Sequence, residues 1–367
     1  MKKLNVVNSV VCGNEDGVFN YFAWPTVARL PGGDLAAVAS GFRLKHICPF
    51  GKLVMCVSRD EGKTWGAPSV LIDTPLDDRD GGIAVSGNDV IVTSFNNTVA
   101  FQRDVLDNKY YSYSPDMQKM IEGYLGAFDA AEAEAKFLGS TYKMSKDGGD
   151  TFGEVRRVPV SAPHGPCVME DGSFLYVGRM FENLDGGPEL RCYKKTGDGD
   201  FKYLSSIEDI TEDKGLLPCE PHAVALPGGR VIVHIRVQNH GETGKNYKNT
   251  FTLYQSDSYD GGKTFSKPRH IGIEHGSPGY LLRHSGGALV CVYGYRLTPY
   301  GQRAAISLDN GATWDADYIL RDDGPDGDLG YPATVELNDG RLLTVYYQKE
   351  RGRDNTVIMQ SVWELPV

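Results

Sequence analysis

The sequence predicts an all-β fold, a six-bladed β-propeller, formed by a single domain over residues 1–367. Two repeats predict it: a glycine-containing hairpin that recurs six times, and a Ser-x-Asp-x-Gly-x-Thr-aromatic turn that recurs four times. Short hairpins at a near-constant interval are typical of propellers, in which each interval builds one four-stranded blade. Hydrophobic residues make up 41% of the chain, which is ample for a buried core.

The hairpin repeat sets the number of blades. It consists of apolar residues, a tight turn and a second apolar run, and it occupies residues 28–40, 83–95, 168–179, 224–236, 282–296 and 335–347. Glycine supplies the positive φ that such turns require. The turn glycines are Gly33, Gly87, Gly172, Gly229, Gly287 and Gly340, at intervals of 54, 85, 57, 58 and 53 residues. One hairpin per blade gives six blades.

The 85-residue interval contains a segment with a helical pattern. Apolar residues between positions 114 and 140 have helical spacing, Ser114 is a suitable N-cap, Pro115 suits the first turn and Gly139 a stop. We therefore predict a helical insertion near 114–138 within the second or third blade, serving as a packing excursion, a subunit contact or a rim of the active-site cleft. The strands at 4–11 and 356–365 are expected to share one blade and so close the ring.

The second repeat is a turn stabilised by its own side chains. The first copy comprises Ser58, Asp60, Gly62, Thr64 and Trp65, and the others begin at Ser145, Ser258 and Ser307. The Ser and Asp side chains cap a tight turn, and the aromatic residue packs between sheets. This motif is the Asp box, and with it the chain resembles the sialidase superfamily over nearly its whole length. The resemblance implies that these turns lie on the face away from the active site and that their aspartates are structural.

The resemblance also implies a set of catalytic residues. In this family a Glu-Pro pair and an Arg at the end of the following hairpin assist the nucleophile and bind the substrate carboxylate, which points to Glu220 and Arg236. Arg303 takes the place of a further arginine of the carboxylate clamp, and Tyr331 that of the nucleophile. Arg suits a carboxylate because its planar fork makes two parallel hydrogen bonds. A tyrosine nucleophile avoids the repulsion between a carboxylate and an anionic substrate.

Two departures from the family pattern stand near the N-terminus. The first arginine of the clamp is replaced in Phe22–Pro25, where Ala23 occupies its position and Trp24 becomes a candidate substrate contact. Arg43 keeps the place of another active-site arginine. The position of the usual acid/base Asp falls at His46, and no Asp or Glu occurs between Arg43 and Ser58. Since a histidine donates a proton near neutral pH, we hypothesise that His46 is the general acid.

Other polar residues stand just before an inner hairpin or at its end, as Glu220 and Arg236 do in theirs. Asp78 and Asp80 are alternative acids or bases, because two carboxylates in different environments split their pKa values. Arg79, His164, Arg179 and His222 are further candidates for substrate binding.

Composition argues against several kinds of partner. A net charge of −10 disfavours nucleic acid and anionic membranes, and no apolar run is long enough to span a bilayer. Seven scattered cysteines without paired spacing indicate reduced thiols in a cytoplasmic protein, or a secreted one if the chain is a trimmed mature form. We expect no metal or cofactor, a carbohydrate as partner, and oligomerisation, if any, through the inserted helix.

The leading interpretation is an exo-acting glycoside hydrolase that removes an acidic or otherwise polar terminal sugar. A polysaccharide lyase is the alternative enzyme, because arginine can neutralise a uronate carboxylate while Tyr or His removes the neighbouring proton. A carbohydrate-binding propeller without catalysis is the third alternative, which the replacement at Ala23 and the missing acid favour.

Overall fold

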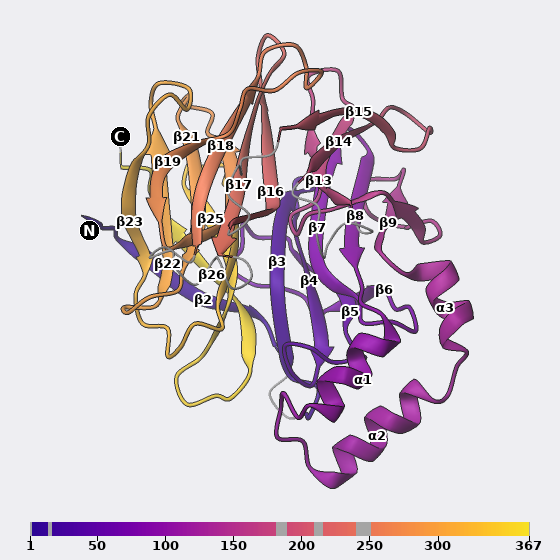
Figure 1. Cartoon of the computed structure of the whole chain (residues 1–367). Helices are drawn as coiled ribbons and strands as arrows, with labels where there is room; N and C mark the ends of the chain where they lie inside the picture. Colours follow the sequence, from indigo (N-terminus) through magenta and orange to yellow (C-terminus); the bar gives the residue numbers. More distant parts are fainter. Residues whose placement is uncertain (1, 14–16, 181–188, 209–215, 240–250, 367) are drawn as a thin grey trace.

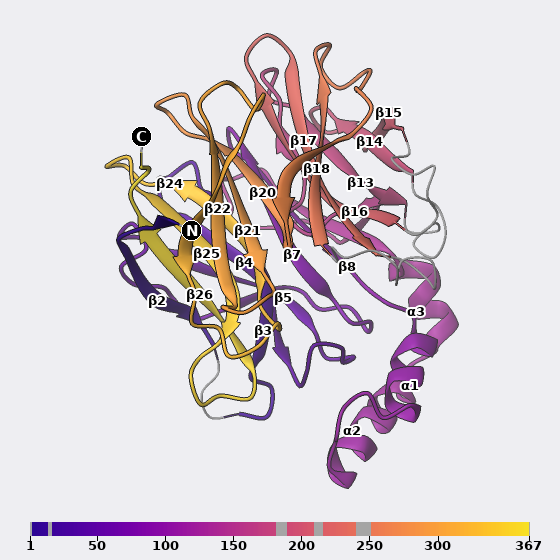
Figure 2. The same ribbon diagram turned by 60° about the vertical axis from the view of Figure 1, so that its left-hand side comes forward.

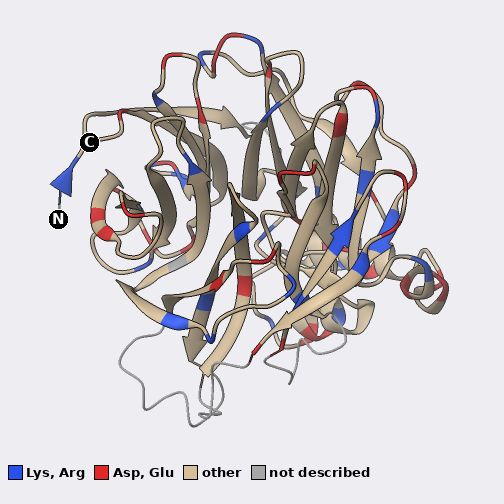
Figure 3. Ribbon diagram, turned by 90° about the horizontal axis from the view of Figure 1, so that it is seen from above, with Lys and Arg blue, Asp and Glu red and all other residues tan. Residues whose placement is uncertain are grey.

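The chain forms six β-sheets arranged around one axis (Figures 1 and 3). The computed structural model describes residues 2–13, 17–180, 189–208, 216–239 and 251–366. Each sheet has four main strands, and consecutive strands along the chain pair antiparallel within a sheet. The prediction of a six-bladed β-propeller is confirmed.

The first three blades follow each other along the chain. The first has the order β3 (Tyr21–Arg29), β4 (Leu35–Arg43), β5 (Lys52–Ser58) and β6 (Ser69–Ile72). The second has the order β7 (Arg79–Ser86), β8 (Asp89–Phe95), β9 (Ser140–Ser145) and β10 (Arg156–Val158). In the third, the short β11 (Val160–Ser161) and β12 (Cys167–Val168) both pair with β13 (Phe174–Met180), which continues to β14 (Leu190–Lys195) and β15 (Lys202–Ile207).

The other three blades complete the ring. The fourth has the order β16 (Leu216–Leu226), β17 (Arg230–Asn239), β18 (Phe251–Ser258) and β19 (Arg269–Glu274). The fifth has the order β20 (Gly276–Arg283), β21 (Leu289–Tyr295), β22 (Gly301–Ser307), β23 (Asp315–Arg321) and β1 (Lys2–Lys3). The sixth has the order β24 (Gly330–Glu336), β25 (Leu342–Lys349), β26 (Thr356–Trp363) and β2 (Val6–Cys12).

The predicted hairpins join the first and second strand of every blade. The six turn glycines all have positive φ, as these turns require; in the first blade Gly33 has φ 96° and its amide donates to the Leu30 carbonyl at 2.9 Å. The second strands are apolar and almost fully buried, since the cores lie between adjacent sheets. This arrangement leaves the first strand of each blade beside the axis.

The ends of the chain close the ring, as predicted. Strand β2 pairs antiparallel with β26, with Val6 opposite Trp363 and Val10 opposite Met359. Figure 2 shows β2 beside β26, with the two termini on the same side of the molecule. The edge of the last sheet is therefore covered by the first long strand of the chain.

The Asp boxes have the structural role that the sequence predicts. In the first, the Ser58 hydroxyl donates to Asp60 at 2.9 Å and accepts from the Gly62 amide, while Thr64 donates to Asp60 from both its amide and its hydroxyl. The same bonds recur in the other three copies. These turns lie at the same end of each sheet as the inner hairpins, so they are remote from the residues that begin the first strands.

The insertion is longer and more divided than predicted. It lies within the second blade, between β8 and β9, and it contains three helices: α1 (Val99–Asp107), α2 (Pro115–Leu125) and α3 (Ala130–Phe137) (Figure 1). Ser114 caps α2 as expected, its side chain accepting from the Met117 amide. The helical insertion predicted near 114–138 is confirmed, but it contains two helices there and not one. Helix α2 ends at its C-cap Gly126, and Asp129 caps the start of α3.

The described structure also bears on membrane insertion and on disulfide bonding. In the described part of the molecule, no helix has the length and apolar character needed to cross a bilayer. All seven cysteines are free thiols, and six of them are buried.

Candidate active site

A cavity of about 420 Å³ lies at the end of the axis where the first strands begin. Its wall contains four arginines and two carboxylates, so it is electropositive in an otherwise acidic chain. The lining residues are His46, Arg79, Asp80, Phe95, Asn97, Ser161, Ala162, Pro163, Arg179, Leu217, Cys219, Glu220, Arg236, Gln238, Arg296 and Tyr331.

A repeated backbone irregularity aims side chains from the first strands toward the axis. Trp24, Asp80, Glu220 and Tyr331 have φ of 54°, 49°, 46° and 48°, respectively, and each is followed by Pro or Gly. The pairing with the second strand shifts register at each of these residues. Such β-bulges redirect a side chain, and positive φ in non-glycine residues is a strain that occurs at functional sites.

Three predicted residues meet at the floor of the cavity. The Tyr331 hydroxyl donates to Glu220 Oε1 at 2.6 Å and accepts from Arg236 Nη1 at 3.1 Å. Arg236 also forms a hydrogen-bonded ion pair with Glu220 and donates from Nη2 to Gln238 at 2.5 Å. The sixth and fourth blades thus contribute a phenol, its proton acceptor and a cation to one hydrogen-bonded group.

The charges of this group differ from those of free side chains. Burial and the Glu220 carboxylate raise the pKa of Tyr331 well above its usual value, so the resting residue is a neutral phenol. Burial alone would raise the pKa of Glu220, but Arg236 and the Tyr331 hydroxyl outweigh it and lower the pKa below its usual value. Glu220 is therefore ionised and ready to accept the phenolic proton.

Asp80 stands apart from this group on the cavity wall. It is 9% exposed, and within the described chain its carboxylate has no hydrogen-bond partner. Burial raises the pKa of Asp80 to about 7, with Glu220 adding to the rise and Arg79 opposing it. A carboxyl group with this pKa is part protonated at neutral pH and suits general acid catalysis.

Aromatic side chains support the arginines that face the cavity. The Arg79 guanidinium lies 4.1 Å from the centre of the Trp24 ring. Arg296 lies 5.6 Å from the Tyr331 ring centre and 5.5 Å from that of Phe251. An aromatic face holds a guanidinium without neutralising its charge, so Arg296 remains available to an anion, whereas Arg79 also lies 3.5 Å from the Asp77 carboxylate.

His46 lines the cavity but is bound to the protein through one ring nitrogen. Its Nδ1 is 2.8 Å from the Tyr21 hydroxyl and 3.1 Å from Asp328 Oδ1, and its ring packs edge-on against Trp24. Burial lowers the pKa of His46, and the bond to Asp328 opposes this. The neutral ring that donates from Nδ1 to Asp328 presents an unprotonated Nε2, which makes it a poor proton donor in the resting site.

Three predicted residues do not reach the cavity. Arg43 is fully buried and makes two hydrogen bonds to Asp77, at 2.6 and 3.0 Å. Asp78 is also fully buried and accepts from the amide and hydroxyl of Thr74. Arg303 donates to the backbone carbonyls of residues 299, 302 and 321. These contacts hold all three side chains in the protein interior, away from the cavity in which the sequence analysis expected them.

Three other predicted residues lie behind the cavity wall. Trp24 is 2% exposed and acts as the platform under Arg79. His164 lies deeper on the axis, with its ring centre 6.3 Å from that of Tyr331, and it hydrogen-bonds the Thr26 hydroxyl at 3.0 Å. His222 lines a different cavity, at the other end of the first strands. Arg179, by contrast, lines the cavity as expected.

The structure adds residues that the sequence reasoning missed. Arg296 lines the cavity where Arg303 was expected, and Asp328 and Tyr21 hold His46. Arg296 ends the fifth hairpin, as Arg43, Arg179 and Arg236 end theirs, so its position in the repeat was a usable signal. In the residues that the structure describes, no group of three or more His, Cys, Asp or Glu side chains is arranged to hold a metal ion.

Comparisons with known proteins agree with the propeller fold described above. The model of the BNR repeat-like domain family matches residues 125–344. The sequence has no significant match among curated proteins. Of the solved structures, a protein of unknown function from Dyadobacter fermentans is 23% identical, with a TM-score of 0.74 over 98% of this chain and 99% of that chain.

Two enzymes share the fold at lower identity. The NanB sialidase from Streptococcus pneumoniae is 14% identical, with a TM-score of 0.66 over 97% of this chain and 70% of that chain. The α-L-arabinanase from Penicillium chrysogenum, complexed with arabinobiose, is also 14% identical, with a TM-score of 0.65 over 98% of both chains. At these identities the likeness shows a sialidase-like propeller fold.

Proposed function

The chain belongs to the family of BNR repeat-like domains, and we propose that it is an exo-acting glycoside hydrolase that removes an acidic or otherwise polar terminal sugar from a glycan. The observation that carries the proposal is the hydrogen-bonded group of Tyr331, Glu220 and Arg236 on the cavity floor. A site that only bound sugar would not need an ionised carboxylate poised to deprotonate a buried phenol.

Each member of the group has a defined part in the proposed reaction. The Tyr331 oxygen attacks the anomeric carbon while its proton passes to Glu220. Arg236 donates to the same oxygen and stabilises the negative charge that it gains in the transition state. The bond between the anomeric carbon and the leaving oxygen breaks as the general acid protonates that oxygen. Water then attacks the anomeric carbon and gives a proton to the same group, now a base, while the bond to Tyr331 breaks and Glu220 returns the proton to the phenol oxygen.

The substrate carboxylate would be bound by arginines. Arg236 and Arg296 both contact the Phe251 ring, Arg296 also contacts the Tyr331 ring, and Arg79 and Arg179 line the same cavity. We assign the clamp to Arg236 and Arg296 in place of Arg303, since only the former two line the cavity. Their excess over the cavity carboxylates favours an anionic sugar.

Asp80 is our preferred general acid, ahead of His46 and Asp78. Its carboxyl group faces the cavity with a pKa of about 7, so a protonated fraction is present when the leaving oxygen needs a proton. His46 remains the second candidate, since it lines the same cavity.

A turnover screen tests the proposal. Chromogenic glycosides of sialic acid, uronic acids and neutral sugars would be offered to the protein and to the variants Tyr331→Phe, Asp80→Asn and His46→Asn. We expect release from an anionic glycoside that falls 10²- to 10⁴-fold in Tyr331→Phe and Asp80→Asn. The matched control is Asp260→Asn, in an exposed Asp box remote from the cavity, which should turn over normally.

The outcome at His46 separates the two candidate acids. Loss of release in His46→Asn with retention in Asp80→Asn would transfer the role of acid to His46. Absence of release from every glycoside would contradict a hydrolase of these sugars and favour a binding propeller if the sugars still bind.

A polysaccharide lyase is the second candidate, and one observation favours it. His46 is held by Asp328 through Nδ1, which leaves its Nε2 as a proton acceptor on the cavity wall. Such a base could remove the proton beside an arginine-bound uronate carboxylate. A lyase product contains a new double bond that absorbs in the ultraviolet, so uronate polymers with ultraviolet detection distinguish the two reactions.

A further inference from the structure

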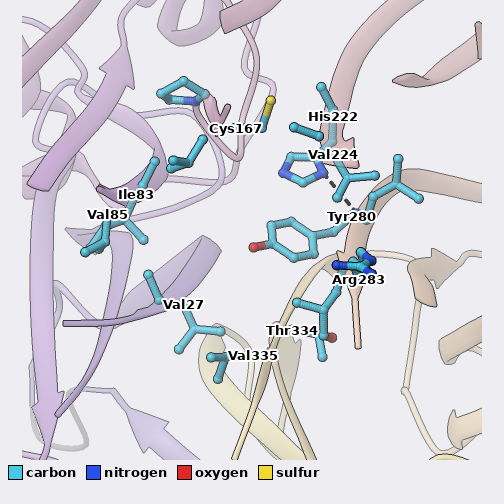
Figure 4. A pocket seen from close by; sticks show the side chains of 18 of the residues that line it. Val27, Ile83, Val85, Cys167, His222, Val224, Tyr280, Arg283, Thr334 and Val335 are labelled. Atoms are coloured by element: carbon cyan, nitrogen blue, oxygen red, sulfur yellow. Dashed lines mark hydrogen bonds between the residues drawn. The ribbon is translucent and has the colours of Figure 1, made fainter. Parts of the chain in front are cut away.

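A second cavity, of about 340 Å³, lies on the axis at the other end of the first strands (Figure 4). Residues from the first strands of all six blades line it, and it shares no lining residue with the candidate active site. The lining residues that matter here are Val27, Val85, His222, Tyr280, Arg283 and Val335. The reaction proposed above makes no use of this space.

The His164 ring lies between an aromatic residue of each cavity. The His164 ring centre is 6.3 Å from that of Tyr331 on one side and 5.2 Å from that of Tyr280 on the other. His164 is 1% exposed, so it fills the axis between them. A ligand in the second cavity would therefore enter from the Asp-box face and make no contact with the candidate catalytic residues.

His222 presents a fixed hydrogen-bond donor to the second cavity. Its Nδ1 accepts the Leu281 amide at 2.9 Å, which requires an unprotonated Nδ1 and places the proton of the neutral ring on Nε2. Burial and the neighbouring His164 lower the pKa of His222 well below its usual value, so the ring is neutral. His222 is 5% exposed, and within the described residues its Nε2 has no partner; Figure 4 shows this nitrogen on the cavity side.

Tyr280 adds a second donor beside the first. Its ring stacks on that of His222, with centres 4.1 Å apart and planes inclined by 23°. Figure 4 shows its hydroxyl directed into the cavity, and no partner for it exists in the described part of the chain. Burial raises the pKa of Tyr280 to about 12, so the hydroxyl keeps its proton. Two neutral donors therefore stand side by side on one wall.

The rest of the wall suits a small anion with an apolar body. No Asp or Glu lines the cavity, whereas Arg29 and Arg283 do. Arg29 is paired with Glu61, whereas Arg283 is exposed and has no ion-pair partner among the residues that the structure describes. Most of the remaining lining side chains are aliphatic, including Val27, Val85 and Val335.

We propose that the second cavity binds a small organic monocarboxylate. The carboxylate accepts hydrogen bonds from His222 Nε2 and the Tyr280 hydroxyl, and the hydrocarbon part packs against the valines of the other first strands. Both donors face the cavity without a protein partner among the described residues, and an acceptor with a negative charge would bind both at once.

Hexanoate is a suitable probe, with hexanamide as its uncharged analogue. Isothermal titration calorimetry on the full chain should show binding of hexanoate and at least tenfold weaker binding of hexanamide. Tyr280→Phe keeps the ring stack and removes only the hydroxyl, so it should weaken hexanoate binding by roughly tenfold or more. Arg296→Gln, in the other cavity, is the matched control and should leave this binding unchanged.

A second measurement reports on the site itself. In protein labelled with ¹⁵N-histidine, hexanoate should shift the Nε2 resonance of His222 while its Nδ1 stays unprotonated. Loss of hexanoate binding in Arg296→Gln with retention in Tyr280→Phe would overturn the proposal, because the carboxylate would then occupy the active-site cavity. An unshifted His222 resonance at millimolar hexanoate would also overturn it.

Discussion

Four strained residues define the functional end of the molecule at the scale of single residues. Trp24, Asp80, Glu220 and Tyr331 hold positive φ, which costs of order 1–3 kcal/mol each in a non-glycine residue. Three of them line the active-site cavity, and the fourth supports Arg79. The repeated bulge therefore lowers the stability of the fold while it directs these side chains toward the axis.

The proposed reaction depends most on the ionisation of Glu220. Glu220→Gln keeps the size of the side chain but removes the proton acceptor of Tyr331, whose pKa is far too high for ionisation without help. We expect kcat for the chromogenic substrate to fall 10²- to 10⁴-fold, with an intact fold by circular dichroism. Undiminished turnover in this variant would contradict the role of Tyr331 as a nucleophile activated by Glu220.

Asp80 should make stability depend on pH. Its pKa rises from 3.8 to about 7 on folding, so between these values the native state binds more protons than the unfolded state. Stability is therefore lost as the pH rises through this window, by up to roughly 4 kcal/mol. Asp80→Asn removes this loss, and denaturant titrations should show a larger gain over wild type at pH 8 than at pH 5. An equal gain at both pH values would contradict the raised pKa.

At the scale of elements, the sequence predicts what is repeated and misses what is local. Six hairpins and four Asp boxes are visible because the same turn chemistry recurs, and the bulges recur too, as Trp24-Pro25, Glu220-Pro221 and Tyr331-Pro332. The insertion occurs once, so its division at Gly126 had no second copy to reveal it. Arg303 was misplaced for a related reason: sequence spacing does not tell which of two nearby arginines a strand turns inward.

The insertion stabilises one wall of the active site. Ile121 on α2 is 2% exposed and packs in a cluster with Leu44 and Cys48, on the loop that contains His46. The Tyr113 hydroxyl also donates to the Ile47 carbonyl at 3.3 Å, and Arg79 donates to the His46 carbonyl at 2.8 Å. The helices are thus part of the support of the cavity rim.

Ile121→Ala tests this support. Removing the buried side chain leaves a cavity beneath residues 44–50 and should cost about 2–4 kcal/mol of unfolding free energy. Hydrogen exchange of residues 44–50 should accelerate more than that of the distant fourth blade. Lys119→Ala, on the exposed side of the same helix, is the control and should change neither. Equal acceleration in both regions would indicate global destabilisation instead.

At the scale of the whole molecule, the fold depends on closure between distant parts of the chain. Strand β2 covers the edge of β26, and its Val11 is 6% exposed within the core shared with the first blade. The sequence predicted this pairing, since a propeller with an open last blade would expose a sheet edge. Composition did not predict the electropositive cavity, because a net charge of −10 describes the whole chain and not its axis.

Removal of residues 1–12 should therefore open the ring. The free edge of β26 exposes unpaired backbone groups, and the loss of Val11 alone removes a buried side chain worth roughly 1.5–3 kcal/mol. We expect a lower thermal midpoint and concentration-dependent association by light scattering. Removal of residues 1–3, which deletes only the short β1, is the control and should have little effect. A peptide of residues 2–13 added to the shortened protein should restore the midpoint by pairing with β26. Unchanged stability without β2 would mean that the sixth blade holds with three strands and that closure contributes little.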